Sequence, residues 1–489
     1  MQLKSVAPTA CAFDVLDWAK RVHVVGVAGS GLRGMVHLLH QRGAEISGSE
    51  LSDSPVLEKF RSRGIDCRVG HTSGNVRKDT SLVLVSAAVT PSNPEVTAAL
   101  SRRIPVWKYS ECLGRLMAEK VGIAVAGTHG KTTTTAMVTT ILKETGNDPT
   151  FLIGGEHPRY GSARWGSGAH FVAEACEFDR SFLNMRPRIS LVTNIEADHL
   201  DYFGSLKEVQ RAFADFVALL PEDGFLAFNR DDANSAYLGE FCRSKIGSFG
   251  MQPRGADLWA ADVQLLAGES RFVIATQDGE RVPVSLPVAG EHNVRNALAA
   301  ALVCRHAGVA LEDIAGALAM FTSVKRRFEI LARGPLTVVD DYAHHPTEID
   351  AVLSAARKTF RNRRLIAVFQ PHQHSRLRLF QDGFARVLSA FDRVVVTDVY
   401  RSRDCDEDAR TVRSEDLVAA LRRRGTDALH APGKREVLGE LDASAEPGDV
   451  VLFLGAGDVT DMAHAFSEGV IGGEVAGAAG LPRDPQRVA

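Results

Sequence analysis

The segment 123–138, IAVAGTHGKTTTTAMV, joins an apolar run to a helix-forming run through a short turn bounded by glycines. A strand that enters a helix N-terminus through such a turn binds phosphate, because the backbone N–H groups and the helix dipole favour anionic oxygens. The pattern places the Lys131 cation at the β- and γ-phosphates and the Thr132 hydroxyl on Mg²⁺. Val125 stands where the GxxxxGK[ST] pattern has its first glycine. A plain strand–turn–helix corner with a solvated lysine is the alternative, and the segments described below favour nucleotide binding. The expected phosphate loop is Gly127, Thr128, His129, Gly130, Lys131, Thr132 and Thr133.

Short β-branched runs alternate with longer helix-like stretches along most of the 489 residues. This alternation predicts an α/β fold with largely parallel sheets, and the length allows about three domains at roughly 150 residues each. Three blocks of strands begin near residues 22, 122 and 336. We expect segment 255–290 to be antiparallel and to cover one edge of the central sheet. From about Gly469 the Gly- and Ala-rich composition predicts a frayed tail.

Composition excludes several classes of protein. A formal charge of -3 and an isoelectric point near 6.6 give no reason to expect a nucleic-acid partner. The seven cysteines are scattered without a CxxC pair, as in proteins with reduced thiols. No apolar run approaches the roughly 18 residues of a membrane span, and Asp14 and Asp17 interrupt any signal-peptide core. We therefore expect a cytoplasmic protein without membrane insertion.

A second glycine turn follows the apolar run 22–27. Gly29, Gly31 and Gly34 match GxGxxG, and Glu50 follows about twenty residues later, where a ribose partner is expected. Taken alone, the pattern indicates NAD, but other nucleotides use the same turn because it presents backbone N–H groups to a diphosphate. Glu50 is equally compatible with an ordinary strand-end acid. The turn predicts a diphosphate site of unspecified kind.

Two acidic segments follow strands beside the phosphate loop. Glu174 ends the strand FVAEA and is the expected Mg²⁺ ligand, in preference to Glu177 and Asp179 because it is nearest the strand end. His199 lies among acidic residues in TNIEADHLDYFGS (193–205), a setting suited to a second metal or to a phosphate-facing switch. A helix cap or surface histidine is the alternative.

Two later segments extend the expected nucleotide site. His292, Asn293 and Asn296 lie near a predicted helix start, where asparagines commonly act as caps, and the same side chains could contact an adenine. Arg327, in KRRFE, could reach a γ-phosphate because a guanidinium matches phosphate oxygens bidentately.

Taken in order, GTHGKTTT, EACEFD, TNIEADHLD, GEHN, KRRFE and DDYAHHPTE resemble the Mur ligase family, from about residue 20 to about residue 460. The resemblance implies a UDP-sugar-binding Rossmann-like domain over 1–120 and a central ATP-binding P-loop domain over 121–327. A C-terminal Rossmann-like domain for the amino acid would span 328–465, followed by a flexible tail over 466–489. It also reassigns the first glycine turn from NAD to a UDP diphosphate.

The activity implied by this resemblance is ATP-dependent ligation of L-alanine to the carboxylate of UDP-N-acetylmuramate, through an acyl phosphate, in peptidoglycan precursor synthesis. ATP and Mg²⁺ are the implied cofactors, and a monomer or weak homodimer is expected. One alternative is a murein-recycling ligase of the same family that adds a tripeptide to the same UDP-sugar. Alternatives from other classes are an NAD-dependent dehydrogenase and a non-catalytic P-loop switch.

The resemblance also implies roles for individual residues. The implied UDP-sugar site is Gly29, Ser30, Gly31, Glu50 and Ser86. The implied ATP site adds His292, Asn293, Asn296, Arg327 and Asp341 to the phosphate loop, and the metal ligands are Thr132, Glu174 and His199. The implied amino-acid-binding residues are Tyr342, His372 and Arg376. The implied catalytic residues are Lys131, His199, Arg327, His344 and His345. Either His344 or His345 would serve as the base.

One departure concerns the amino-acid loop FQPHQHSRLR (369–378). Gln373 and His374 replace the family's usual Arg and Tyr, while Arg376 is kept as a partner for the alanine carboxylate. A missing arginine removes a charge-assisted pair. The choice between L-alanine, glycine and L-serine therefore stays open at the level of sequence.

Overall fold

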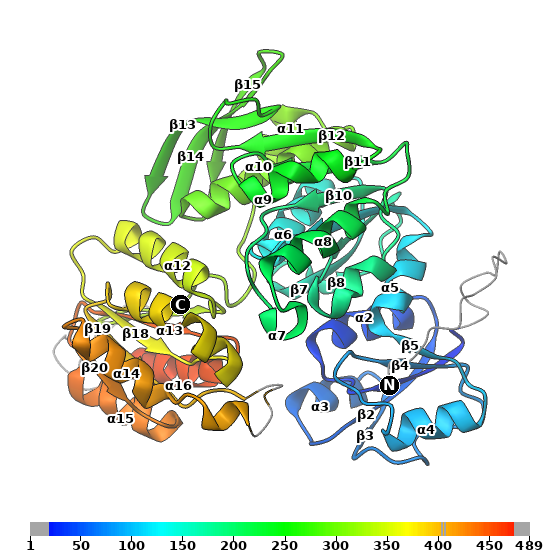
Figure 1. Ribbon diagram of the computed structural model, residues 1–489, viewed down its shortest axis with the longest axis horizontal. Helices are drawn as coiled ribbons and strands as arrows, with labels where there is room; N and C mark the ends of the chain where they lie inside the picture. The colour runs from blue at the N-terminus through cyan, green and yellow to red at the C-terminus, as the bar shows by residue number, and fades with distance from the viewer. Residues whose placement is uncertain (1–18, 402–403, 405–406, 474–489) are drawn as a thin grey trace, which may run out of the picture. The chain divides into compact units, whose positions relative to one another are not determined.

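The computed structural model describes residues 19–401, 404 and 407–473. The described chain forms two compact units, which are treated separately below (Figure 1). The first unit takes in the described residues up to 262 together with 272–284 and 295–321. The second takes in 263–271, 285–294 and the described residues from 322 onward.

The first unit begins with a five-stranded parallel sheet in the order β3-β2-β1-β4-β5. Its strands are β1 (Arg21–Val25), β2 (Glu45–Glu50), β3 (Asp66–Val69), β4 (Leu82–Val85) and β5 (Val106–Lys108). Its helices are α2 (Ser30–Gln41), α3 (Pro55–Arg61), α4 (Pro94–Ser101) and α5 (Tyr109–Met117). The strand order reverses between β1 and β4, and ligands of open parallel sheets bind beyond the carboxyl ends of strands at such a point.

The second sheet has ten strands in the order β15-β14-β13-β12-β11-β10-β6-β9-β7-β8. They are β6 (Val121–Ala126), β7 (Thr150–His157), β8 (Gly161–Arg164), β9 (His170–Glu174), β10 (Ile189–Val192), β11 (Phe225–Asn229), β12 (Lys245–Gly250), β13 (Leu258–Leu266), β14 (Glu269–Thr276) and β15 (Arg281–Leu286). The central strand β6 is parallel to both neighbours, β9 and β10. The segment 255–290 does occupy an edge, as expected. Its first strand, β13, joins the sheet in parallel, since Phe249 of β12 pairs with Leu258 of β13 in that sense.

Helices and 3₁₀ turns complete this part of the chain. They are α6 (Lys131–Glu144), η1 (Phe178–Asn184), α7 (Leu200–Phe203), α8 (Leu206–Val217), α9 (Ala233–Ala236), η2 (Tyr237–Phe241), α10 (Glu291–His306) and α11 (Leu311–Ala319). Helix α6 is buried over Thr132–Leu142 and contacts α11, β7 and β9. This packing fixes the helix that carries the phosphate loop at its N-terminus.

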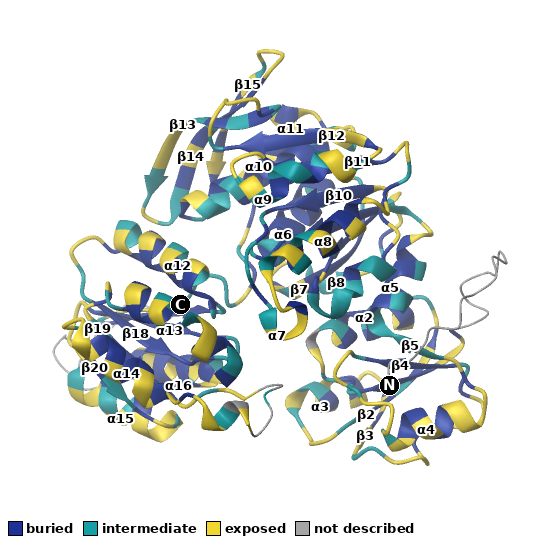
Figure 2. Ribbon diagram, viewed as in Figure 1, coloured by how far each residue is buried: buried dark blue, intermediate teal, exposed yellow. Residues whose placement is uncertain are grey.

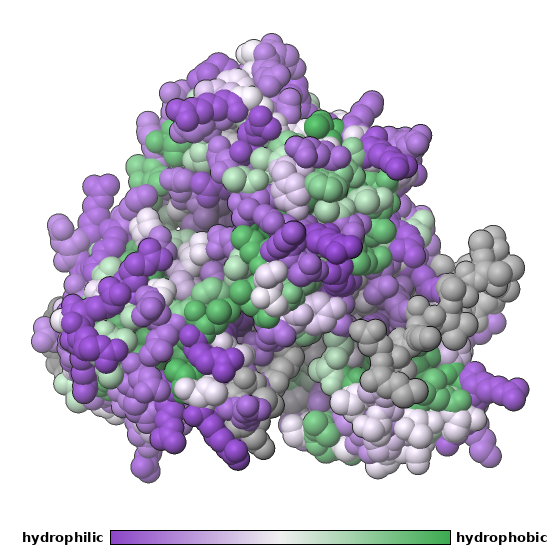
Figure 3. Space-filling model, in the orientation of Figure 1, coloured by the Kyte–Doolittle hydropathy of each residue, from purple (hydrophilic) through white to green (hydrophobic). Residues whose placement is uncertain are grey.

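The second unit contains a six-stranded sheet in the order β16-β17-β21-β18-β19-β20. Its strands are β16 (Glu329–Arg333), β17 (Thr337–Asp341), β18 (Leu365–Phe369), β19 (Arg393–Val396), β20 (Ala428–His430) and β21 (Val450–Leu454), and only β16 pairs in the antiparallel sense. Its helices are α12 (Pro346–Thr359), α13 (His374–Leu388), η3 (Asp408–Arg410), α14 (Ser414–Arg423), α15 (Lys434–Ser444) and α16 (Val459–Gly472). The central strands are buried and the helices expose one face (Figure 2). The exposed face over α14 and α15 is largely hydrophilic (Figure 3).

Helix α16 corrects the expectation of a tail from residue 466. The helix continues to Gly472 because Phe466 and Val470 are buried in the core of the second unit. Gly473 then ends it in a left-handed conformation. The remainder of the expected tail, 474–489, lies outside the described residues.

The described residues also bear on the expectations from composition. Five of the seven cysteines are described, and all five are free thiols. No helix among the described residues is long and apolar enough to cross a membrane.

Candidate functional site

The phosphate loop lies between β6 and α6, and it is shorter than the sequence pattern implies. Val125 is a buried residue of β6 that pairs with Leu191 and Glu174 on the neighbouring strands. The turn therefore begins at Gly127, with φ 137°, and ends at Gly130, with φ 81°. Both angles lie in the region that favours glycine, which explains why the turn needs these two glycines and tolerates Val125.

The loop is held by the segment that follows the adjacent strand β10. Thr193 donates from Oγ1 to the His129 carbonyl at 2.6 Å, and the Thr128 N–H donates to the Asn194 carbonyl at 2.9 Å. The Asn194 side chain accepts from the His129 N–H at 2.9 Å and donates to its carbonyl at 3.1 Å. A Cβ at Gly127 would stand 1.9 Å from Thr193 Oγ1, so only glycine fits there. Sequence reasoning missed this supporting role for Thr193 and Asn194.

Lys131 is held at the base of the loop by three acceptors. Its Nζ donates to the Gly127 carbonyl at 2.5 Å and to the Thr128 carbonyl at 3.0 Å. It also pairs with the buried Glu177 carboxylate at 3.0 Å. Burial lowers the pKa of Lys131, but the charge and hydrogen bond of Glu177 together with the nearby Cys176 and Glu174 raise it overall. The ammonium is therefore fixed as a cation beside the loop N–H groups, as phosphate binding requires.

Oxygen donors converge beside Lys131. Thr132 donates from Oγ1 to Glu174 Oε2 at 3.2 Å, and the Gly154 N–H of β7 donates to the other carboxylate oxygen. A Cβ at Gly154 would lie 2.5 Å from Glu174, so this glycine makes room for the carboxylate. A hydroxyl and a carboxylate are the hard oxygen donors that suit Mg²⁺. The donor set thus fits the expected magnesium site at Thr132 and Glu174.

His199 lies next to this cluster and adopts a left-handed backbone with φ 52°. Its Nε2 is 3.9 Å from Glu177 and 3.8 Å from Asp198. The structure therefore brings His199 to Lys131 through Glu177, the residue that sequence reasoning ranked below Glu174. Asp179 and Arg180 near Glu177 also have positive φ, at 54° and 53°. Adjacent strained residues of this kind cluster at functional sites.

The predicted adenine residues divide between the two units. Asn296 belongs to the first unit and lies against the phosphate loop, since a Cβ at Gly130 would be 2.6 Å from its Oδ1. His292 and Asn293 belong to the second unit. The Asn293 amide donates to the Ala289 carbonyl at 2.8 Å, which ties it to the segment before α10. For this reason Asn296 is the residue of the three that the structure joins to the phosphate loop.

The first glycine turn lies between β1 and α2 and contains no cation. The N–H groups of Gly26 and Val27 donate to the Ser49 carbonyl at 2.9 and 3.0 Å. Glu50 accepts from the Ala28 N–H at 3.1 Å and from its own neighbour Leu51 at 3.0 Å. Glu50 therefore braces the turn. Gly29, Ser30 and Gly31 form the helix entry, and Ser86 follows β4 on the other side of the strand-order reversal.

A buried carboxylate, that of Glu95, contacts Ser49, the residue whose carbonyl accepts from this turn. Glu95 of α4 accepts from Ser49 Oγ at 2.6 Å and from the Asn75 amide at 2.5 Å, and it lies 3.4 Å from His23 Nε2 and from His71 Nδ1. Burial raises the pKa of Glu95, but the hydrogen bonds from His23, Ser49 and Asn75 hold it below its ordinary value. Nothing in the sequence alone indicated this network.

In the second unit, Arg327 follows β15 and α11 and precedes β16. Its neighbours Arg326 and Phe328 have positive φ, at 60° and 52°, so the backbone on both sides of Arg327 is strained. Asp341, at the end of β17, accepts from the Phe328 N–H at 2.7 Å and so fixes this strained segment. Burial raises the pKa of Asp341 to about 6, against the lowering effect of Arg327. Tyr342 lies under the Arg327 guanidinium at 5.2 Å.

The predicted amino-acid residues lie together beyond β17 and β18. The His344 ring is 5.3 Å from Tyr342 and 5.6 Å from His372, and Arg376 Nη1 is 3.0 Å from His372 Nδ1. His345 is buried, begins α12 as its N-cap and packs on Phe380 at 4.6 Å. The His344 Nδ1 likewise lies 3.0 Å from the Tyr342 carbonyl. Both histidines therefore remain candidates for the base.

Gln373 and His374, which depart from the family pattern in the amino-acid loop, both make hydrogen bonds within the second unit. His374 is buried, and its Nδ1 lies 2.9 Å from the Val412 carbonyl. Gln373 has φ 70°, is buried and donates its N–H to the Tyr400 carbonyl at 2.9 Å. The Gln373 backbone and the His374 side chain thus fix the start of α13, the helix that contains Arg376.

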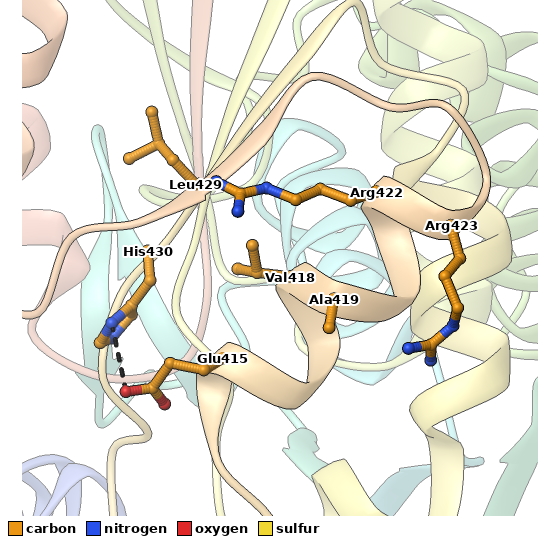
Figure 4. Close-up of a pocket in the computed structure, with 7 residues that line it drawn as sticks. All are labelled: Glu415, Val418, Ala419, Arg422, Arg423, Leu429 and His430. Atoms are coloured by element: carbon orange, nitrogen blue, oxygen red, sulfur yellow. Dashed lines mark ion pairs between the residues drawn. The ribbon is translucent and has the colours of Figure 1, made fainter.

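A surface hollow in the second unit lies elsewhere, between α14 and β20 (Figure 4). Its lining includes Arg422, Arg423 and His430, and His430 pairs with Glu415 at 3.5 Å. None of the residues predicted to bind a ligand lines it. The candidate residues of each unit therefore lie at the strand ends of that unit and not in this hollow.

Three family models match successive parts of the chain. The Mur ligase family catalytic domain matches residues 21–121, the Mur ligase middle domain matches 125–304, and the Mur ligase glutamate ligase domain matches 326–457. Together they span most of the sequence. The chain belongs to the Mur ligase family.

Individual relatives agree with this assignment. The chain is 40% identical over 450 residues to UDP-N-acetylmuramate–L-alanine ligase of Sulfurihydrogenibium sp. (strain YO3AOP1), covering 92% of this chain and 97% of the relative. It is also 40% identical over 469 residues to the ligase of the same name from Xanthomonas euvesicatoria pv. vesicatoria (strain 85-10), covering 94% and 98%. The crystal structure of UDP-N-acetylmuramate-alanine ligase from Thermotoga maritima matches with TM-score 0.79 at 29% identity, covering 92% and 99%. A murein peptide ligase from Psychrobacter arcticus shares the fold, with TM-score 0.70 at 22% identity, covering 95% and 100%.

Proposed function

We propose that this chain is an ATP-dependent ligase that joins L-alanine to the carboxylate of UDP-N-acetylmuramate, releasing ADP and phosphate, in peptidoglycan precursor synthesis. The observation that carries this proposal is the cluster at the end of β6. There, a fixed Lys131 cation and the oxygen donors Thr132 and Glu174 surround a phosphate loop. The relatives at about 40% identity, each named for this reaction, supply the substrates.

The first step transfers the γ-phosphoryl group of ATP to the muramate carboxylate, which gives an acyl phosphate and ADP. Carboxylate and triphosphate are both anionic, so their approach needs concentrated positive charge. Lys131 and the loop N–H groups supply it at the phosphates, and Arg327 is assigned to the γ-phosphate. Mg²⁺, held by Thr132 and Glu174 and with His199 assigned to a second ion, would neutralise further charge.

In the second step the amine of L-alanine attacks the acyl carbonyl, and the tetrahedral intermediate collapses to an amide and phosphate. The amine must be neutral to attack, so it needs a base. We assign this role to His344, whose ring lies beside Tyr342 and His372. Arg376 is assigned to the alanine carboxylate because a guanidinium pairs bidentately with carboxylate oxygens.

The alternative functions are less well supported. A murein-recycling ligase that adds a tripeptide shares this fold, but the similarity to the murein peptide ligase structure is 22% identity, whereas relatives named for alanine addition reach 40%. Membership of the Mur ligase family argues against a dehydrogenase or a non-catalytic switch. We further propose that the protein works in the cytoplasm as a monomer or weak homodimer.

The test is phosphate release from UDP-N-acetylmuramate, ATP and Mg²⁺ with each of the twenty amino acids and with the L-alanyl-γ-D-glutamyl-diaminopimelate tripeptide. We expect release with L-alanine, with weaker release for glycine and L-serine, because one methyl or hydroxyl group changes binding only modestly. Release with the tripeptide and with no single amino acid would overturn the proposal.

A further inference from the structure

Tyr109 is the first residue of α5 and directly follows β5, the edge strand of the first sheet. The preceding residue, Lys108, pairs with Asp179 at 2.6 Å, and the Asn184 amide donates to Ser110 Oγ at 2.9 Å. These contacts tie the start of α5 to the strained η1 segment that follows Glu174 and Glu177. The position of Tyr109 is therefore fixed by neighbours on both sides.

The hydroxyl end of the Tyr109 ring lies against the first glycine turn. A Cβ added at Gly31 would be 3.3 Å from the Tyr109 Cζ and 3.5 Å from both Cε atoms. A side chain at position 31, in the first turn of α2, would therefore crowd the Tyr109 ring. This contact places the phenol beside the N-terminus of a twelve-residue helix, where an anion is favoured.

Tyr109 differs from Tyr160 and Tyr237 of the same unit in the contacts of its hydroxyl. Tyr237 donates to the Gln210 carbonyl at 2.8 Å, and Tyr160 donates to Glu144. Within the described residues, the half-buried Tyr109 has no hydrogen-bond partner for its hydroxyl. Burial, followed by the nearby charge of Glu174, raises the pKa of Tyr109, so the group stays a protonated donor. The Tyr109 hydroxyl can therefore donate a hydrogen bond to a phosphate oxygen that is bound at this turn.

We propose that the Tyr109 hydroxyl donates a hydrogen bond to the diphosphate of the UDP-linked substrate and strengthens the binding of that substrate alone. This assignment rests on the proposed function, which places the UDP diphosphate at the turn after β1. ATP binds at the other turn and does not depend on this donor.

The test is Tyr109→Phe, which removes the oxygen and keeps the ring that packs on Gly31. A hydrogen bond to a charged group contributes about 1.5 kcal/mol, or roughly tenfold in affinity. By titration calorimetry we expect the Kd values for UDP and for UDP-N-acetylmuramate both to rise about tenfold, with the Kd for Mg–ATP unchanged. The melting temperature should not fall, because no internal hydrogen bond is lost.

Tyr237→Phe is the matched control. It loses the bond to Gln210, so it should lower the melting temperature and leave all three Kd values unchanged. Wild-type affinity of Tyr109→Phe for UDP would overturn the inference. A loss confined to UDP-N-acetylmuramate would also overturn it, since the hydroxyl would then contact the sugar or the muramate. Failure of the proposed function is distinct from both, because wild-type protein would then release no phosphate from UDP-N-acetylmuramate, ATP and L-alanine, whatever its affinity for UDP.

Discussion

The turn after β1 and the turn after β6 both lead from a parallel strand into the N-terminus of a helix. They differ in charge. The first is braced by the Ser49 carbonyl and by Glu50, with the Glu95 carboxylate buried below it. The second contains Lys131 and lies beside Glu174 and Glu177. The proposed function treats both turns as phosphate sites because each leads into a helix N-terminus. We propose that the side chains around them separate a turn that binds a diphosphate from one that activates a triphosphate.

The largest effect is expected from Lys131→Ala. Loss of the only cation fixed in the second turn removes charge neutralisation during phosphoryl transfer, so kcat should fall at least about a thousandfold. UDP should still bind with wild-type affinity to the first turn. ADP release and UDP titration on the same preparation provide the two readouts. Lys143→Ala, which breaks a surface pair with Asp148, is the control that should keep activity. Joint loss of UDP binding and activity would show that the turns do not act separately.

The next largest effect is expected from Glu174→Gln. The amide can still accept from the Gly154 N–H but lacks the charge that a divalent cation requires. The Mg²⁺ concentration for half-maximal activity should rise at least about tenfold and kcat should fall about a hundredfold. Glu156→Gln on the same strand, β7, is the control. An unchanged Mg²⁺ requirement would place the metal elsewhere.

The contribution of Glu95, which contacts Ser49 beside the first turn, to the free energy of unfolding should depend on pH. The pKa of Glu95 is lowered in the folded chain, so its charge stabilises the fold above the unfolded-state value of 4.5, and this stabilisation is lost as pH falls through the lowered folded-state value. Glu95→Gln should therefore lower the free energy of unfolding by about 1–3 kcal/mol at pH 7. Denaturant titrations of both proteins from pH 3 to pH 8 should show the difference shrinking below about pH 4.5. A constant difference across this range would exclude a charged Glu95.

The smallest effect is expected from Glu50→Gln. Because Glu50 braces the Ala28 N–H and an amide oxygen can still accept that bond, the Kd for UDP should rise only about threefold. Glu45→Gln, on the same strand but in a surface ion pair with Arg21, should leave UDP binding unchanged. A tenfold or larger loss for Glu50→Gln would mean that its carboxylate contacts the nucleotide directly.

Sequence alone predicted the fold class, since alternating strand and helix patterns mark parallel sheets. It also predicted that Lys131, Thr132, Glu174 and His199 lie near one another, and the structure brings them together because they follow strands that are neighbours in the sheet. It could not reveal Glu177 as the partner of Lys131, since that pairing depends on how the strained segment after β9 folds back.

Long-range contacts were equally hidden from sequence patterns. The Glu95 network joins four separate segments, and Tyr109 meets Gly31 across 78 residues of chain. The length of α16 was missed because its Gly- and Ala-rich end is stabilised by burial of Phe466 and Val470 in the core, which composition does not show.

The most direct measurement for the central claim is a competition titration of wild-type protein with UDP-N-acetylmuramate and a non-hydrolysable Mg–ATP analogue. If the two turns hold different ligands, each ligand should bind with one-to-one stoichiometry in the presence of saturating amounts of the other. UDP in excess should then displace UDP-N-acetylmuramate and leave the ATP analogue bound. Displacement of the ATP analogue by UDP would contradict the division of the two turns.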